Sequence, residues 1–207
     1  MAKLRRGTCV NELYMRTRDI LDFSGPWKDH IGLPEVVGSW FVYGHSGHGK
    51  TSYTTQLARY LTEFGTVWYN GLEEGDSLSF VNALRRAGME NAPSPFLLLE
   101  DNLEELRLRL SRRNRARFVF IDSLQLFGIS FQEYEQLLAD HPETLFIFIG
   151  HAEGKKPEGR VGKRIEYLSY VKVWVEGYRA TAKTRYGGTE PFVIFQKRAE
   201  EYWEKLG

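Results

Sequence analysis

The segment from Gly44 to Thr51 constrains this chain more than any other, because it has the form G-x-x-x-x-G-K-T. Four apolar residues precede it at 40–43, and a segment with helical spacing follows it. In such a loop, glycines let backbone N–H groups turn toward a β-phosphate, the lysine reaches the β- and γ-oxygens, and the threonine hydroxyl binds Mg²⁺. The sequence therefore predicts a site for a nucleoside triphosphate, expected to be ATP, with Mg²⁺.

The predicted nucleotide contacts form one continuous segment. They are Gly44, His45, Ser46, Gly47, His48, Gly49, Lys50, Thr51 and Ser52. The helix expected after the loop places its N-terminus at the phosphates, where its dipole favours negative charge. The residues that would hold the adenine are not apparent from the sequence.

Length and composition are typical of a globular protein. The chain has 207 residues, of which 42% are apolar and 27% charged, and this suits a single domain. We expect an ATPase domain over 36–207, preceded by a lead segment over 1–35. Cys9 is the only cysteine, so no internal disulfide and no cysteine-based zinc site can form. Apolar runs are too short to cross a bilayer and no secretory signal is evident at residues 1–6, so we expect a cytoplasmic protein.

Segments of strand and helix character alternate after the loop. Helices are expected over 51–64, 77–87, 102–114 and 131–139, with a further short one near 11–21, and strands over 66–69, 96–99, 118–121 and 145–149. After Gly150 the pattern changes to a polar, glycine-rich loop over 154–162 and then to short strands at 171–175, 179–184 and 191–195. The sequence predicts an α/β fold whose central sheet is mainly parallel and ends in an antiparallel meander.

Acidic and histidine side chains follow three of the expected strands. Asp122 ends the run at 118–121 and is predicted to bind Mg²⁺ beside Thr51. Glu73 and Glu74 follow the strand at 66–69, where one of them can activate the attacking water, although a solvated acidic turn would look the same. His151 follows the strand at 145–149 and either senses the γ-phosphate or caps the loop behind it.

Lys183 and Arg185 are two positions apart on an expected strand, so both side chains point to the same side of it. Such a pair can bind the γ-phosphate held by a neighbouring subunit. A basic strand edge that discourages aggregation would have the same composition.

Two clusters of cations could attract nucleic acid although the formal net charge is only +1. The first lies in the expected loop over 152–164 and suits the backbone of single-stranded DNA; its members are Lys155, Lys156, Arg160, Lys163 and Arg164. The second consists of Arg107, Arg109, Arg112, Arg113, Arg115 and Arg117, for which a solvated or acid-paired helix face is an equally good interpretation.

Together these segments, over about residues 36–198, resemble the ATPase core of the RecA superfamily, and within it the RadA/Sms repair ATPases and DnaB-type replicative helicases. The segment 69–74 is similar to the RadA strand that ends in paired glutamates, and Gly150-His151 to the start of its DNA-contacting loop. Lys183-Thr184-Arg185-Tyr186-Gly187 resembles the Lys-Asn-Arg-Phe-Gly signature of that family. Tyr170 departs from the pattern, since it stands where the family usually has Asp.

The resemblance implies a RecA-like three-layer sandwich and a Mg-dependent ATP hydrolase that forms a ring or filament on single-stranded DNA. It gives Glu73 the place of the catalytic glutamate and implies that Lys183 and Arg185 act across a subunit interface. Recombination, repair or replication would be the setting, with a helicase or repair protein as a possible partner. The alternatives are a KaiC-like regulatory ATPase or helicase-loader module acting on a protein, and a P-loop kinase of small molecules.

Overall fold

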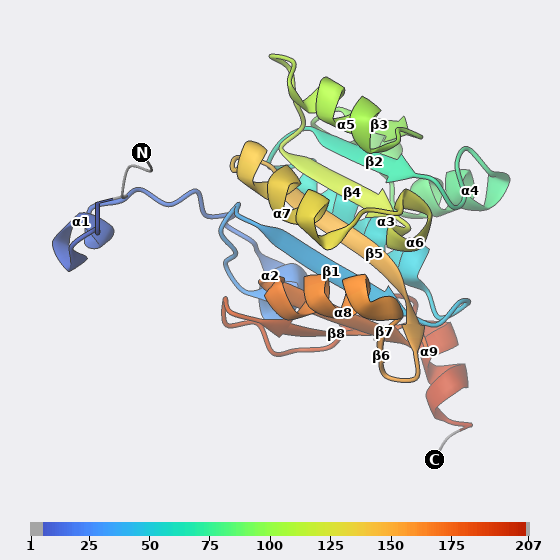
Figure 1. Ribbon diagram of the computed structural model, residues 1–207. Coiled ribbons are helices and arrows are strands. Elements are labelled where there is room, and N and C mark those ends of the chain that lie inside the picture. The colour runs from blue at the N-terminus through green and yellow to red at the C-terminus, as the bar shows by residue number, and fades with distance from the viewer. Residues whose placement is uncertain (1–5, 206–207) are drawn as a thin grey trace.

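A computed structural model describes residues 6–205 (Figure 1). Residues 1–5, the start of the expected lead segment, and residues 206–207 lie outside the described part. Within it, none of the helices combines the length and the apolar character that a bilayer crossing would require.

The strands of residues 6–205 form one nine-stranded sheet, in the order β3-β2-β4-β5-β1-β7-β8-β9, with β6 paired to β5. They are β1 Ser39–Gly44, β2 Val67–Gly71, β3 Phe96–Leu99, β4 Phe118–Asp122, β5 Leu145–Glu153, β6 Lys156–Pro157, β7 Val171–Glu176, β8 Arg179–Thr184 and β9 Phe192–Val193. From β3 to β7 all neighbours along this order are parallel, and β8 and β9 are antiparallel additions. The expected α/β fold, with a mostly parallel sheet and antiparallel strands near the C-terminus, is confirmed.

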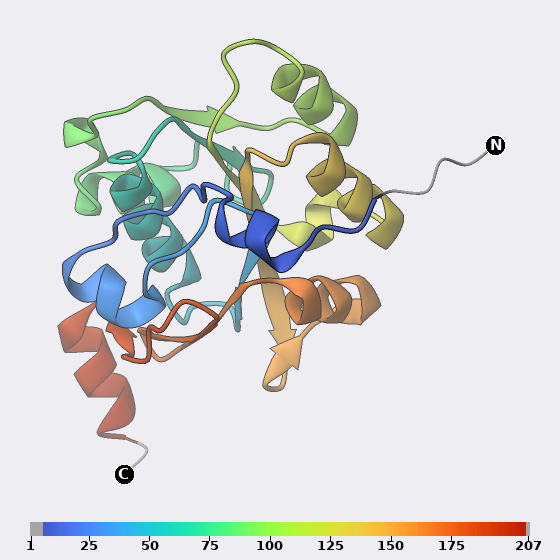
Figure 2. The same ribbon diagram turned by 90° about the vertical axis from the view of Figure 1, so that its left-hand side faces the viewer.

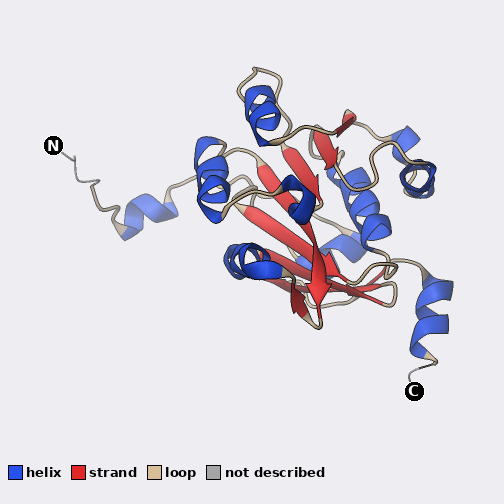
Figure 3. Ribbon diagram, turned by 45° about the vertical axis from the view of Figure 1, so that its right-hand side comes forward, coloured by secondary structure: helices blue, strands red, loops and turns tan. Residues whose placement is uncertain are grey.

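Helices cover both faces of this sheet (Figures 1 and 3). They are α1 Val10–Tyr14, α2 Gly25–Ile31, α3 Lys50–Leu61, α4 Leu78–Arg86, α5 Leu103–Leu110, α6 Leu124–Phe127, α7 Phe131–Asp140, α8 Gly159–Leu168 and α9 Gln196–Trp203, with a 3-10 turn at Met89–Asn91. Residues of α2, α3 and α4 belong to the hydrophobic core on one face, and residues of α5 to α8 to the core on the other.

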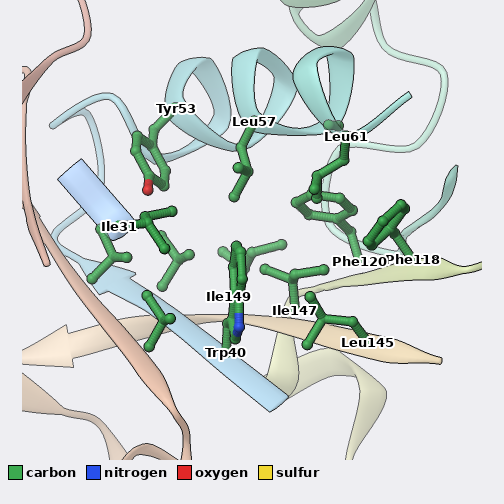
Figure 4. Packing of buried hydrophobic residues seen from close by; sticks show 14 of the residues in the cluster. Ile31, Trp40, Tyr53, Leu57, Leu61, Phe118, Phe120, Leu145, Ile147 and Ile149 are labelled. Carbon is green, nitrogen blue, oxygen red and sulfur yellow. The ribbon is translucent and has the colours of Figure 1, made fainter. Parts of the chain in front are cut away.

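Successive side chains of each strand point to opposite faces of the sheet, so one strand contributes residues to both cores. In β1, Trp40 and Val42 face the first core, whereas Phe41 faces the second. Figure 4 shows Leu57 and Leu61 of α3 over the side chains of the central strands. These contacts fix the helix that follows the phosphate loop firmly against the sheet.

Part of the expected lead segment is built into the core. Leu21, Phe23, Trp27 and Ile31 are buried with the residues of β1 and α3. The dipeptide Gly25-Pro26 opens α2, although both residue types interrupt helices elsewhere, because proline fits the first turn of a helix where no N–H is needed. The helix expected near 11–21 is shorter, Val10–Tyr14, and buries none of its residues.

The segment expected as a basic loop over 152–164 is mostly regular structure, so that prediction was wrong. β5 continues to Glu153, turns back as β6, and leads into α8 (Figure 2). The helix forms despite its glycines because Val161 and Ile165, four residues apart, pack on the second core. α9, which no sequence pattern indicated, follows β9.

Candidate functional site

The phosphate loop leaves β1 at Gly44 and enters α3 at Lys50. Gly47 and Gly49 have φ of +78° and +101°, a region that side chains disfavour. At Gly44 a Cβ atom would lie 2.2 Å from the carbonyl oxygen of Val175, so the loop passes β7 too closely for any larger residue. The backbone of the loop therefore requires glycine at these positions, whether or not a ligand is bound.

The lysine and threonine of the loop already have partners in this structure. Lys50 Nζ donates a 3.1 Å hydrogen bond to the carbonyl oxygen of His45, and Thr51 Oγ1 donates a 2.8 Å hydrogen bond to Glu74 Oε1. Burial lowers the pKa of Lys50, while the nearby carboxylates of Glu73, Asp122 and Glu74 act in the opposite direction. The ammonium group is thus held close to the acids that the sequence predicted for the site.

The sheet register brings the predicted acids and histidine to one edge. Asp122 of β4 pairs with Gly71 of β2 on one side and with Ile149 of β5 on the other, and His151 of β5 pairs with Gly44. The backbone N–H groups of Leu72 and Glu73 donate to the carbonyl oxygen of Asp122 at 2.7 and 3.2 Å. The turn that carries the paired glutamates is thereby fixed to the strand that carries Asp122.

Asp122 is the most buried of the three acids, with 7% of its surface exposed. Burial raises its pKa to about 6, the hydrogen bond from Tyr69 lowers it, and the charges of Glu73 and Glu74 raise it. Tyr69 donates to Asp122 Oδ2 at 2.6 Å and also lies 2.9 Å from Thr54 Oγ1 of α3. This network holds the carboxylate in one orientation.

Glu73 points to His151, whose Nε2 lies 3.3 Å from Glu73 Oε2. The Glu73 side chain is 40% exposed, so water can reach it. The structure therefore brings the candidate base and the candidate sensor into contact, which is the arrangement needed for the histidine to orient the carboxylate.

A cleft of about 260 Å³ lies over the loop and is lined by loop residues and by the three acids. Its lining includes Lys50, Thr51, Glu73, Glu74 and Asp122, and also three residues that sequence reasoning missed: Arg86, Tyr178 and Arg198. Arg86 comes from the last turn of α4, Tyr178 from the β7–β8 turn and Arg198 from α9. No local motif marks these positions, because only the packing of α4 and α9 around the loop brings them together.

An adjoining cavity of about 550 Å³ shares Arg86, Tyr178 and Arg198 with the cleft and extends along α3 past Gln56 to Ile194. The Arg198 guanidinium lies 5.2 Å from the centre of the Tyr178 ring and donates to its hydroxyl at 2.9 Å. The cavity thus has aromatic and aliphatic walls next to the phosphate loop, as a nucleobase would require.

The β7–β8 turn is hydrogen-bonded to the phosphate loop. The backbone N–H of Tyr178 donates to the His48 carbonyl oxygen at 3.1 Å, and that of Gly177 donates to His48 Nδ1 at 3.0 Å. Trp203 of α9 donates to the Gly177 carbonyl oxygen at 3.1 Å. Tyr178 has a φ of +59°, a strained conformation for a tyrosine, held by these contacts.

Lys183 and Arg185 do not line the cleft of their own chain. Lys183 pairs with Lys172 of β7, which pairs with Phe41 in the middle of β1, and Arg185 lies beyond the end of β8 that is farther from the loop. Both line a separate cavity with Tyr170, whose ring lies 4.9 Å from the Arg185 guanidinium.

The predicted DNA-binding residues fall into two groups. Lys163 lies 3.4 Å from Glu153, and the Arg164 guanidinium lies 3.5 Å from the centre of the Phe131 ring. Lys155, Lys156 and Arg160 are exposed on the β5–β6 hairpin and the start of α8, and none of them has an ion-pair partner within residues 6–205. These last three are the cations available to a polyanion.

Three of the six arginines at 107–117 are paired with acids. Arg109 makes two hydrogen bonds to Asp101, at 2.6 and 2.9 Å. Arg115 pairs with Glu143, and Arg117 with Asp19. The interpretation as an acid-paired face is confirmed for these three side chains.

No family model matches the chain, and no curated protein is significantly similar to it in sequence. A function is therefore assigned from the residues of the cleft and their geometry.

Proposed function

We propose that this protein is a Mg-dependent ATPase with a RecA-like three-layer fold, of the type found in RecA, RadA and DnaB proteins. It assembles into a ring or filament and couples ATP hydrolysis to binding or movement on single-stranded DNA, in the cytoplasm. The observation that carries the proposal is one cleft in which the phosphate loop meets Glu73 and Asp122, which follow or end two neighbouring parallel strands. His151 of a third parallel strand contacts Glu73 from outside the lining of this cleft.

Cations and backbone donors of this chain account for binding of the triphosphate. The loop supplies N–H groups and Lys50, and Arg86 and Arg198 add two guanidinium groups at the same cleft. Guanidinium groups form charge-assisted hydrogen bonds with phosphate oxygens. The cavity beside Tyr178 and Gln56 is then the place for the base.

The residues fit Mg²⁺, because the Thr51 hydroxyl and the Asp122 carboxylate both line the cleft and oxygen is the ligand that this ion prefers. Within residues 6–205, no group of three or more His, Cys, Asp or Glu side chains forms a metal site of its own. Mg²⁺ commonly takes one or two protein ligands together with substrate phosphates and water. When bound, it would neutralise charge on the β- and γ-phosphates.

Glu73 is the proposed base. It accepts a proton from a water molecule whose oxygen attacks the γ-phosphorus, and the bond between that phosphorus and the β,γ-bridging oxygen breaks, which releases ADP and phosphate. His151, 3.3 Å away, orients the carboxylate and is placed to respond to loss of the γ-phosphate. Lys50 and the arginines stabilise the charge that shifts to the leaving ADP.

The remaining cations act between molecules in this proposal. Lys183 and Arg185 line a cavity separate from the cleft of their own chain and would reach the triphosphate of a neighbouring subunit. Lys155, Lys156 and Arg160 on the hairpin would contact the DNA backbone. His151 links the two activities, since it belongs to the same strand, β5, as the first half of that hairpin.

ATP turnover measured with and without single-stranded DNA tests the proposal, with native mass determined in parallel in the presence of a non-hydrolysable ATP analogue. We expect DNA to stimulate phosphate release and the analogue to favour a ring or filament, and Lys50→Ala to abolish turnover. Turnover that ignores DNA but responds to a protein partner would instead favour a regulatory module. Formation of a phosphorylated metabolite would favour a kinase.

A further inference from the structure

We infer that the two adjacent glutamates have different functions: Glu74 positions the Mg²⁺-binding hydroxyl of Thr51, while Glu73 alone serves as the base. The inference rests on the proposed ATPase function and deepens it. The contact that carries it is the 2.8 Å hydrogen bond from Thr51 Oγ1 to Glu74 Oε1. A hydroxyl whose proton is donated to a carboxylate keeps its lone pairs free for a cation.

The second oxygen of Glu74 supports a role next to a cation. Glu74 Oε2 is buried, and within the described residues it has no hydrogen-bond partner. A buried carboxylate oxygen without a donor is unfavourable unless positive charge compensates it. Glu74 lines the same cleft as Thr51, so a cation bound at the hydroxyl would lie next to this oxygen.

The other two acids of the cleft have different partners. Glu73 points to His151 and is partly exposed, as a base that must meet water should be. Asp122 accepts the hydrogen bond of Tyr69, and within residues 6–205 it makes no hydrogen bond with the Thr51 hydroxyl. Glu74 is the acid that accepts the Thr51 proton, so it sets the orientation of this hydroxyl.

Binding of a fluorescent ATP analogue, measured once with excess Mg²⁺ and once with EDTA, tests the inference without requiring hydrolysis. In the unchanged protein Mg²⁺ should tighten binding by about tenfold or more. Glu74→Gln keeps the shape of the side chain but removes its charge. This variant should lose most of the increase in affinity that Mg²⁺ causes, while its affinity for the analogue in EDTA is retained. Glu73→Gln should keep the full gain and lose turnover. Glu135→Gln, an exposed position on α7, is the matched control and should change neither.

A double-mutant cycle separates a metal-positioning role from a general effect on folding. Thr51→Val should lose the same increase in analogue affinity with Mg²⁺. The double variant Thr51→Val/Glu74→Gln should lose no more of this increase than either single variant. Glu74→Asp, which restores the charge, should recover part of the gain. Full Mg²⁺ gain in Glu74→Gln, or additive losses in the double variant, would overturn the inference. Failure of the unchanged protein to bind the analogue at all would instead refute the ATPase proposal.

Discussion

The Tyr69 hydroxyl donates a 2.6 Å hydrogen bond to Asp122 Oδ2 between the neighbouring strands β2 and β4. Without this bond the buried carboxylate would be protonated still more readily, because burial and the adjacent glutamates already raise its pKa. The pair therefore keeps Asp122 able to ionise near neutral pH, where it is expected to act.

Asp122 should make the stability of the ligand-free protein depend on pH. Its pKa of about 6 in the folded state exceeds the ordinary carboxyl value of about 4, so the folded protein binds this proton more tightly than the unfolded chain. The stability it contributes is present below about pH 4 and is lost as the pH rises through about 6, by about 3 kcal/mol in total.

Asp122→Asn should therefore raise the free energy of unfolding at pH 7 and flatten its decline between about pH 4 and 6. Denaturant unfolding of both proteins over that range measures the difference. Tyr69→Phe, which removes the hydrogen bond, should move the decline to higher pH. Parallel curves for all three proteins would show that Asp122 does not titrate in this way.

Glu73→Gln should abolish hydrolysis while nucleotide binding persists, with a loss of about a hundredfold to ten-thousandfold in turnover. His151→Asn should lose less, about ten- to a hundredfold, because it leaves the base in place and changes its orientation. Single-turnover assays and binding titrations separate the two effects. If Glu73→Gln turns over ATP normally, the base lies elsewhere.

Arg86→Ala and Arg198→Ala should each weaken ATP binding by about tenfold or more, since each removes a charge-assisted contact. Arg85→Ala is the control, because Arg85 lies next to Arg86 on α4 but hydrogen-bonds Asn82. Titration calorimetry gives the affinities. Equal affinities for Arg85→Ala and Arg86→Ala would show that Arg86 does not contact the nucleotide.

Neutralising Lys155, Lys156 and Arg160 to glutamine should weaken binding of single-stranded DNA and reduce the slope of log affinity against log salt by about 2, at about 0.7 per phosphate contact. Arg16, Lys28 and Arg85, changed together, are a control of equal charge at exposed positions outside both cation clusters. Fluorescence anisotropy at several salt concentrations provides the slopes. A similar loss in both triple variants would indicate only a general effect of charge.

Mixing Arg185→Ala subunits with Glu73→Gln subunits should restore part of the turnover that each lacks, because an interface between them can combine an intact base with an intact arginine. Lys183→Ala in place of Arg185→Ala should behave in the same way. Steady-state phosphate release over a range of mixing ratios is the measurement. Absence of rescue at every ratio would argue against a site shared between subunits.

Much of the fold follows from local patterns. The strands at 96–99, 118–122 and 171–176 were predicted to within one residue. The first two contain short continuous apolar runs, and the third alternates buried with partly exposed residues. Four helices were missed or read as loops: α2 at Gly25-Pro26, the short α6, α8 among glycines and cations, and α9. Their helical form depends on tertiary contacts, such as those of Trp27 and Ile165 with the two cores, which periodicity alone did not reveal.

The candidate site could be predicted where it depends on strand ends. Parallel register alone brings Asp122, His151 and the turn after Gly71 to one edge. Arg86, Tyr178 and Arg198 could not be predicted, because they reach the cleft from helices and a turn that are distant in sequence. The hydrogen bond between Thr51 and Glu74 likewise could not be predicted, because it depends on the conformation of one short turn and the spacing of residues does not determine that conformation.

The β7–β8 hairpin contacts the phosphate loop at one end and presents Lys183 and Arg185 toward the other. In the assembly that we propose, this ribbon would join each nucleotide to the next one along the array. A small shift of the loop on product release would then displace the cations that serve the adjacent protomer. The two six-residue strands of the hairpin would thus couple each nucleotide site mechanically to the site of the next protomer.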